Sequence, residues 1–182
     1  MAYNFDGYWK DVGTIDSLWE ANMDLLGEPP VLDLNDPAWR IYTRNPVMPP
    51  HYVGANATVK NTLVSEGSVL YGSARHSVLF CGTHIDLDAT VEDSIVFPSA
   101  RIGKHTQVRK AIIGENAVIG ENAVIGKGAK LGVPPREGET VDNRLTGDIV
   151  LIGIDGDDSP GENLRQHMVR VRDYFLKIRN GV

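Results

Sequence analysis

A six-residue repeat is the feature that most restricts the fold of this sequence. Ile113-Gly-Glu-Asn-Ala-Val is followed at once by an identical copy that begins at Ile119, and then by Ile125-Gly-Lys-Gly-Ala-Lys. A repeat this short leaves no room for a helical hairpin, and it is too regular for a β-sandwich. Aliphatic residues continue the pattern toward the N-terminus, mostly at steps of five or six residues: Val53, Val59, Val64, Leu70, Leu79, Ile85, Val91, Val96, Ile102 and Val108. This pattern predicts a hexapeptide-repeat β-helix.

The aliphatic positions, taken in threes, define the coils of this β-helix. The coils begin at Val53, Leu70, Ile85, Ile102 and Ile119, so their periods are 17, 15, 17 and 17 residues. A three-sided parallel β-helix has such a period. In the shorter coil Ala74 follows Leu70 by only four positions, which predicts a corner that is two residues shorter than the others. We expect an all-β fold: a three-sided parallel β-helix of about five coils, with an N-terminal helix stub and a C-terminal helix.

Residues at fixed offsets from the aliphatic positions predict the inward side chains and the corners. Side chains two apart on a strand share a face, so the small residue found two before most aliphatic positions also points inward. The residue three positions after most aliphatic positions is of a type, such as Gly, Asn or Asp, that tolerates the left-handed backbone of a tight corner. The small residues are Ala57, Ser68, Thr83, Ala89, Ala100, Thr106, Ala117, Ala123 and Ala129, and the corner residues are Asn56, Gly67, Gly82, Asp88, Ser99, His105, Asn116, Asn122 and Gly128.

Composition limits the partners and the compartment. The chain has 18 basic and 24 acidic residues and a net charge of −6, so we expect no nucleic-acid partner. The single cysteine, Cys81, cannot form an internal disulfide and fits a reducing cytoplasm. The sequence has neither an apolar run long enough to span a membrane nor a basic-then-apolar leader. We expect a soluble, cytoplasmic protein without a membrane partner.

The segments that precede the repeats divide into two parts. Residues 1–26 are rich in aromatic and turn-forming residues, look like the cut end of a longer domain, and end in a helix. Thr14 can cap this helix, which is expected to run to about Leu26 with one largely apolar face. Residues 27–52 form a proline-rich connector with one short strand over 39–43.

The repeats and the tail complete the organisation. The β-helix domain is expected over residues 53–132, and residues 133–182 hold a polar loop, a strand and a helix. The strand, at 149–152, is expected to cover the open edge of the last coil. The helix begins at a capping box that contains Ser159 and runs to about Asn180. Its apolar stripe fits either the β-helix of its own chain or another subunit.

Residues 8–25 carry a specific signature: Tyr-Trp-x-Asp-Val-Gly-Thr, followed by Trp-x-Ala-Asn. This stretch resembles the end of the catalytic domain of bacterial ADP-glucose pyrophosphorylases (glucose-1-phosphate adenylyltransferases), in particular the form found in Gram-positive bacteria. The resemblance continues through residues 39–43, 49–50, 61–67 and 76–80 to about Gly126, and it weakens from about residue 132.

The resemblance implies an enzyme that makes ADP-glucose and pyrophosphate from ATP and glucose 1-phosphate for glycogen synthesis and that requires Mg²⁺. It also implies a left-handed β-helix that joins subunits into a homo-oligomer, usually a tetramer, and that helps to bind a sugar-phosphate effector. The family's nucleotide-binding domain, with its Gly-rich phosphate loop, would lie upstream of Met1. We therefore expect this chain to be the C-terminal piece of such an enzyme, to hold no catalytic residue of its own, and to be inactive alone.

Three residues near the N-terminus match family positions close to the substrates. Asp11 matches the second Mg²⁺-binding carboxylate, which links the metal to the nucleotide phosphates. Tyr8 and Trp9 would lie near the sugar-nucleotide pocket of the complete enzyme. The alternative for Asp11 is a solvated side chain, because one carboxylate near a chain end is a poor Mg²⁺ site.

Five basic residues in one coil form a candidate effector site: Arg101, Lys104, His105, Arg109 and Lys110. The resemblance places Arg109 and Lys110 where related enzymes carry arginines linked to the effector response, and the guanidinium fork suits phosphate oxygens. The family commonly has Arg at the position of Lys110, so the identity of the effector stays open. The alternative is a set of solvated charges, because Ile102 and Val108 fill the interior.

Three histidines keep two other classes of function open. Hexapeptide β-helices also form trimeric acyltransferases in which a histidine acts as general base, a role open to His76, His84 or His105. None of them has an obvious partner in the sequence, and the family resemblance accounts for more residues. The third class is a freestanding oligomerisation module without chemistry.

Overall fold

The computed structural model describes residues 4–38, 46–126 and 149–152. Helix α1 spans Ile15–Met23 and continues into a 3₁₀ turn, η1, at Asp24–Leu26. The strands are β1 (Tyr52–Val53), β2 (Val59–Val64), β3 (Val69–Leu70), β4 (Ser73–Leu79), β5 (His84–Ile85), β6 (Thr90–Glu92), β7 (Ile95–Val96), β8 (Arg101–Ile102), β9 (Gln107–Arg109), β10 (Ala111–Ile113), β11 (Val118–Ile119), β12 (Val124–Ile125) and β13 (Val150–Ile152).

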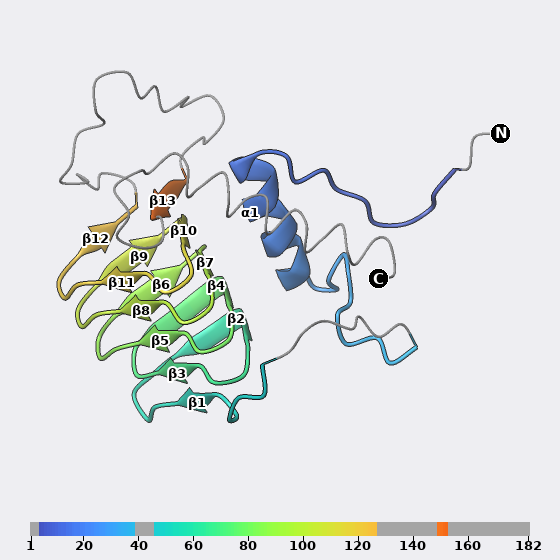
Figure 1. Ribbon diagram of the computed structural model, residues 1–182. Coiled ribbons are helices and arrows are strands. Elements are labelled where there is room, and N and C mark those ends of the chain that lie inside the picture. Colours follow the sequence, from blue (N-terminus) through green and yellow to red (C-terminus); the bar gives the residue numbers. More distant parts are fainter. Residues whose placement is uncertain (1–3, 39–45, 127–148, 153–182) are drawn as a thin grey trace, which may run out of the picture.

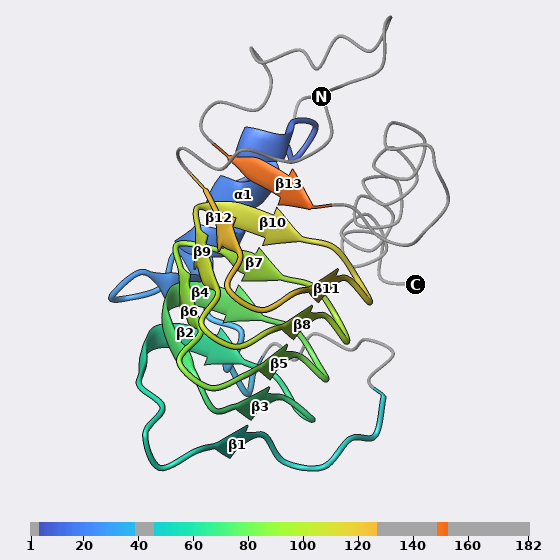
Figure 2. The same cartoon turned by 90° about the vertical axis from the view of Figure 1, so that its left-hand side faces the viewer.

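The strands stack into three parallel faces that together form a β-solenoid (Figures 1 and 2). Face one consists of β1, β3, β5, β8 and β11. Strands β2 and β4 each contribute their first half to face two and their second half to face three. Face two also contains β6, β9 and β12, and face three also contains β7, β10 and β13. Successive strands of face one lie one turn apart, so the described chain completes about four turns.

The strand register confirms the coil periods predicted from the sequence. Along face one, Val53 pairs with Leu70, Leu70 with Ile85, Ile85 with Ile102, and Ile102 with Ile119. The same aliphatic positions therefore stack coil upon coil, about 4.8 Å apart as in any sheet.

The short corner lies where the sequence predicts it, between Leu70 and Ala74. The N–H of Gly72 donates to the carbonyl of Ile85 at 3.3 Å. A Cβ atom at Gly72 would lie 2.3 Å from the carbonyl oxygen of Ala89 and 2.6 Å from that of Asp86. Only a residue without a side chain fits here, because the two missing residues bring the corner against the next coil.

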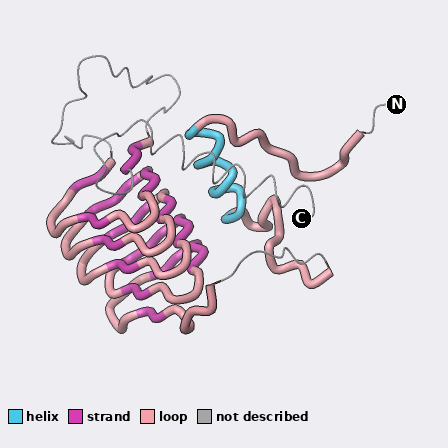
Figure 3. Tube along the Cα trace, in the orientation of Figure 1, coloured by secondary structure: helices cyan, strands magenta, loops and turns pink. Residues whose placement is uncertain are grey.

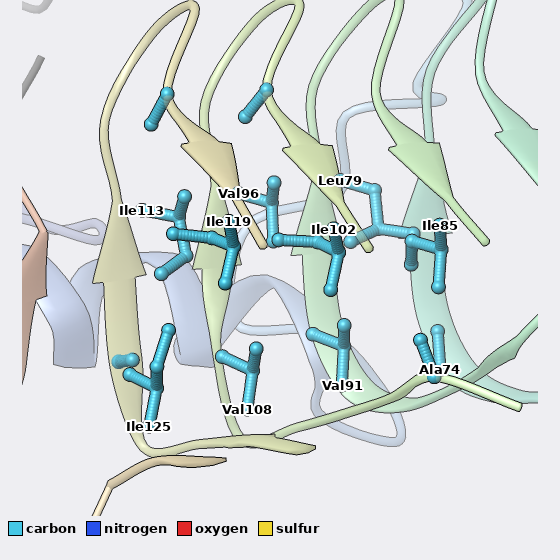
Figure 4. Packing of buried hydrophobic residues seen from close by; sticks show 14 of the residues in the cluster. Ala74, Leu79, Ile85, Val91, Val96, Ile102, Val108, Ile113, Ile119 and Ile125 are labelled. Atoms are coloured by element: carbon cyan, nitrogen blue, oxygen red, sulfur yellow. The ribbon is translucent and has the colours of Figure 1, made fainter. Parts of the chain in front are cut away.

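The interior of the solenoid is a continuous aliphatic column (Figure 4). Its members come from all three faces, and most are almost fully buried: Leu70, Ala74, Leu79, Ile85, Val91, Val96, Ile102, Val108, Ile113, Ile119 and Ile125. Burial of one such side chain contributes about 1.5–3 kcal/mol to stability. The predicted core positions are confirmed, except that Val53 and Val59 of the first turn stay 41% and 37% exposed.

Most of the predicted corner residues adopt the left-handed backbone. Positive φ angles occur at Gly67, Gly82, Asp88, Ser99, His105, Asn116 and Asn122. The prediction is wrong for Asn56, which does not have this conformation, and Gly128 lies outside the described residues. A further set of left-handed residues, which we did not predict as a set, marks the corner between faces two and three: Asn61, His76, Asp93 and Lys110.

Strand β13 confirms the predicted strand over 149–152. It pairs in parallel with β10, and Ile152 lies in register with Ile113. Ile152 packs against the aliphatic column, and Ile149 is buried against the outer surface of face three. The returning chain therefore covers the edge of β10, which would otherwise expose unpaired backbone groups.

Helix α1 covers the outer surface of face three (Figures 1 and 3). The Thr14 side chain accepts the N–H of Ser17 and the Ser17 side chain accepts that of Thr14, so Thr14 caps the helix as predicted. The α-helix ends at Met23 rather than Leu26, and the last turn is 3₁₀. Leu18 and Met23 pack with Leu26 against the outward side chains Val78, Ile95 and Ile112.

Several predictions fall outside the described residues. These are the strand over 39–43, the loop before residue 149, the helix that begins near Ser159 and the small inward residue Ala129. Within the described part of the chain, no helix is long and apolar enough to cross a membrane.

Candidate functional site

The candidate metal ligand Asp11 lies in an extended segment just before α1. Its Oδ1 accepts the N–H of Gly13 at 3.1 Å, and the residue is exposed. Thr14, three residues after Asp11, caps helix α1 and so fixes the backbone on the C-terminal side of Asp11.

The other side of Asp11 is held by the carboxylate of Asp24. Tyr8 donates its hydroxyl to Asp24 Oδ2 at 2.9 Å, and Lys10 Nζ donates to the same oxygen at 2.9 Å. Lys10 also forms an ion pair with Glu20 at 3.1 Å. Asp24 follows the last residue of α1, so the contacts tie the N-terminal segment to the helix.

The electrostatics of this junction favour an ionised Asp24. The hydrogen bond from Lys10 holds the pKa of Asp24 below its usual value. Burial, together with the hydrogen bond to Asp24, raises the pKa of Tyr8 to about 12. Burial alone would lower the pKa of Lys10, but the hydrogen bonds to Asp24 and Glu20 raise it above its ordinary value. The carboxylate thus binds one cation and one phenol that keeps its proton.

Asp11 alone does not make a complete metal site. Mg²⁺ prefers an octahedron of oxygen ligands, in which proteins commonly supply one or two carboxylates and substrate phosphates and water supply the rest. Among residues 4–38, 46–126 and 149–152, no group of three or more His, Cys, Asp or Glu side chains is placed to hold a metal ion. Asp11 fits the role of one ligand, and the others would have to come from nucleotide, water or residues outside the described ranges.

The two aromatic candidates, Tyr8 and Trp9, differ in their surroundings. Trp9 is 69% exposed, whereas Tyr8 is half-buried through its contact with Asp24. Trp9, two residues before Asp11 in the sequence, therefore presents its indole to solvent, whereas the Tyr8 hydroxyl is bound to Asp24.

The five basic candidates are distributed around the coil rather than gathered in one place. Arg101 lies on face one, in register with His84 and Val118. Lys104 and His105 lie between β8 and β9, at the corner that leads to face two. Arg109 ends β9 and lies in register with Glu92, which pairs with Arg75 of the preceding coil.

Lys110 is engaged with the helix. Its ammonium lies 5.6 Å from the centroid of the Trp19 ring, within the range of a cation–π interaction. The Trp19 indole N–H donates to the carbonyl of Asp93 at 2.8 Å. Arg109 and Lys110 are adjacent at the end of face two, and Lys110 reaches α1 through its contact with Trp19.

His76 has a partner that the sequence analysis missed. Its Nδ1 lies 2.8 Å from Asp93 Oδ1, and both side chains are partly exposed. The signal was available, because Asp93 follows His76 by one coil period and therefore stacks on it at the same corner. A carboxylate that orients an imidazole is also a feature of general-base sites. His105 lies 3.7 Å from Asp88, and the His84 ring lies 5.8 Å from that of Tyr71.

Two family models match separate parts of the chain. A model described as GlmU-like, C-terminal hexapeptide, matches residues 49–133, which include the solenoid. A nucleotidyl transferase model matches residues 1–28, which include Asp11 and α1. The two matches meet in space where α1 packs on face three.

Curated proteins are more than half identical to this chain over the stretch they match. A glucose-1-phosphate adenylyltransferase of Acetivibrio thermocellus is 54% identical over 114 residues, which are 63% of this chain and 27% of that protein. Glucose-1-phosphate adenylyltransferases of Bacillus thuringiensis and Bacillus mycoides are 53% identical over 114 residues, 63% of this chain and 30% of theirs. The chain thus spans less than a third of the length of these relatives. By its sequence, this hexapeptide-repeat chain is a relative of glucose-1-phosphate adenylyltransferases.

Proposed function

We propose that this chain is the C-terminal, regulatory and oligomerisation part of an enzyme that makes ADP-glucose and pyrophosphate from ATP and glucose 1-phosphate. The observation that carries the proposal is the combination of a nucleotidyl transferase match at residues 1–28 with a hexapeptide match at 49–133, beside relatives named glucose-1-phosphate adenylyltransferase. In this proposal the product supplies glycogen synthesis, and the enzyme works in the cytoplasm.

The chain contributes one metal ligand to the proposed reaction. Asp11 would bind Mg²⁺, which neutralises phosphate charge during nucleotidyl transfer. In this proposal the exposed Trp9 contacts a bound ligand, and Tyr8 holds the segment through Asp24. The remaining ligands and the phosphate-binding loop belong to a part of the enzyme that these residues do not supply, so the chain by itself is inactive in this proposal.

The proposal also covers the finer architecture and the assembly. The solenoid is left-handed, has about five coils, and is followed by a C-terminal helix over about 159–180. It joins subunits into a homo-oligomer, a tetramer in the complete enzyme. A sugar phosphate binds at the adjacent Arg109 and Lys110. Lys104 and His105, at the preceding corner, and Arg101, on face one, lie elsewhere on the coil and are left out of this site.

An activity assay tests the proposed reaction. The chain alone is expected to show no ADP-glucose synthesis from ATP, glucose 1-phosphate and Mg²⁺. A chimaera in which this chain replaces the matching region of the Bacillus thuringiensis relative is expected to be active. Asp11→Asn should lower its kcat by more than about 100-fold, because loss of even an outer partner of a metal ligand costs about 10–100-fold.

Asp6→Asn is the matched control, since Asp6 is an exposed carboxylate of the same segment. It should leave kcat within about twofold. Robust turnover by the isolated chain, or a fully active Asp11→Asn chimaera, would contradict the proposed division of roles.

A thermal-shift experiment tests the effector site. Fructose 1,6-bisphosphate at millimolar concentration is expected to raise the Tm of the chain, because a ligand that binds only the folded state stabilises it. Arg109→Ala should abolish the shift. Lys60→Ala is the control, because Lys60 is an exposed cation on face two. It lies in register with Arg75, and the register continues through Glu92 to Arg109. An equal shift in both variants would remove Arg109 from the site.

The His76–Asp93 pair is the observation that favours an acyltransferase. The relatives are adenylyltransferases, however, and this favours nucleotidyl transfer over acyl transfer. The absence of any thermal shift with acetyl-CoA would agree with this ranking.

A further inference from the structure

Residues 8–14 form a strap that is held at both of its ends, and Asp11 lies in the middle of it. At one end, Tyr8 and Lys10 both bind Asp24 Oδ2 at 2.9 Å. At the other end, Thr14 caps helix α1. Only three residues separate Lys10 from Thr14, so the backbone that carries the Asp11 carboxylate has little freedom to move.

Asp24 itself is placed by a well-packed element. It directly follows α1, and its backbone N–H donates to the carbonyls of Glu20 and Asn22. The neighbouring Met23 and Leu26 are buried against face three, with exposures of 8% and 6%. The carboxylate of Asp24 is therefore at a fixed position relative to the solenoid, although the side chain itself is only partly buried.

The junction is selective for an ionised carboxylate at position 24. One oxygen accepts from both an ammonium and a phenol, and charge-assisted bonds of this kind are roughly twice as strong as neutral ones. An amide at this position would offer a neutral acceptor to Tyr8 and Lys10. The substitution would keep the shape of the contacts among residues 8, 10 and 24, but residue 24 would lose most of its attraction for Lys10.

We propose that Asp24 is a positioning residue, whose carboxylate holds Tyr8 and Lys10 so that Asp11 is presented at a fixed place beside the solenoid. This inference rests on the proposed function, in which Asp11 is a ligand for Mg²⁺. The solenoid then serves the reaction centre mechanically, because it anchors α1 and, through Asp24, the strap.

The test measures the strap directly in the full chain by NMR. In the unsubstituted protein the backbone order parameters of residues 9–13 should approach the value of about 0.85 that is typical of rigid backbone. In Asp24→Asn they should fall toward about 0.6, while those of α1 stay unchanged. The pKa of Tyr8, followed by ¹³C-tyrosine titration, should fall from about 12 toward its ordinary value of about 10.

Two further variants make the test specific. Glu20→Gln removes the other, more exposed partner of Lys10 and should change neither readout. Lys10→Met should also loosen the strap, and the double variant should be no looser than Asp24→Asn alone, because Lys10→Met removes one of the two contacts that Asp24→Asn already weakens.

The inference is overturned if Asp24→Asn leaves both the order parameters of residues 9–13 and the pKa of Tyr8 unchanged. It is also overturned if α1 loosens together with the strap, since Asp24 would then be a general stabilising residue. Asp11→Asn should leave both readouts unchanged. If the chimaera with the unsubstituted chain is inactive although its strap is rigid, the proposed function is refuted, whereas the role of Asp24 in holding the strap stands.

Discussion

Gly72→Ala is expected to destabilise the solenoid by about 3 kcal/mol. The added Cβ would lie 2.3 Å from the carbonyl oxygen of Ala89 and 2.6 Å from that of Asp86, and both are backbone atoms that cannot rotate away. The corner at Gly72 is the short one, so the strain can be relieved only by shifting β4 relative to β6. Urea denaturation followed by circular dichroism measures the loss as a lower midpoint with an unchanged slope.

Gly120→Ala is the matched control for this prediction. Gly120 follows face one in the last described turn, and a Cβ there would meet nothing within 4 Å. The substitution should change stability by no more than about 0.5 kcal/mol. Equal effects of the two substitutions would show that the close backbone approach at Gly72 is not what requires a glycine.

Ile95→Asp is expected to release helix α1 while the solenoid stays folded. Ile95 is fully buried, but its side chain belongs to the outer surface of face three, where it packs in one cluster with Leu18 and Met23. An unpaired carboxylate in this layer costs about 3–5 kcal/mol if it stays buried. Detachment of α1 hydrates the charge, and the inner aliphatic column does not need to change.

Hydrogen exchange by mass spectrometry checks this outcome. Amides of Ile15–Met23 should lose protection, whereas those of β5, β8 and β11 keep theirs. Thr90→Asp serves as the control, because Thr90 is an exposed outward residue of β6 on face two. The prediction fails if Ile95→Asp unfolds the solenoid as a whole, or if α1 keeps its protection.

The coil architecture was predictable because it is periodic. Each core position packs against the equivalent positions one period before and one period after it. The contacts of Ile102 or Ile119 therefore recur in every coil, and one repeat is enough to predict them. Even the irregular coil was recognisable, since the four-residue spacing from Leu70 to Ala74 is where the register shows the shift. The left-handed corners followed from residue type at fixed offsets, with Asn56 as the exception.

The docking of α1 was not predicted, although the sequence carried a signal for it. On face three, the residue before each core position is aliphatic in four successive coils: Leu63, Val78, Ile95 and Ile112. The corresponding outward residues of faces one and two include His84, Arg101, Thr90 and Gln107. A face that is apolar on both sides must be covered on its outside. The inward positions alone do not reveal this difference, which appears only when the outward residues of the three faces are compared.

The candidate site, too, was predicted only in part. The segment around Asp11 was found from its residue signature, but the role of Asp24 was not, because the contact joins side chains 14 and 16 residues apart with no repeat between them. The pairing of His76 with Asp93 follows the coil period and could have been found by comparing corner residues one turn apart. The basic set was treated as one patch because its members are close in sequence, and the corners of the coil separate them.

The residue pattern alone was enough to predict the solenoid, with its three faces, its register, its short corner and its aliphatic interior. These features depend on contacts between equivalent positions of adjacent coils, and the repeated residue pattern specifies the same contact in each coil. The three-dimensional arrangement was needed to show which face α1 covers, how Trp19 contacts Asp93 and Lys110, and how Asp24 holds the strap. Each of these contacts occurs once, between a non-repeating segment and one place on the solenoid, so no periodic signal specifies it.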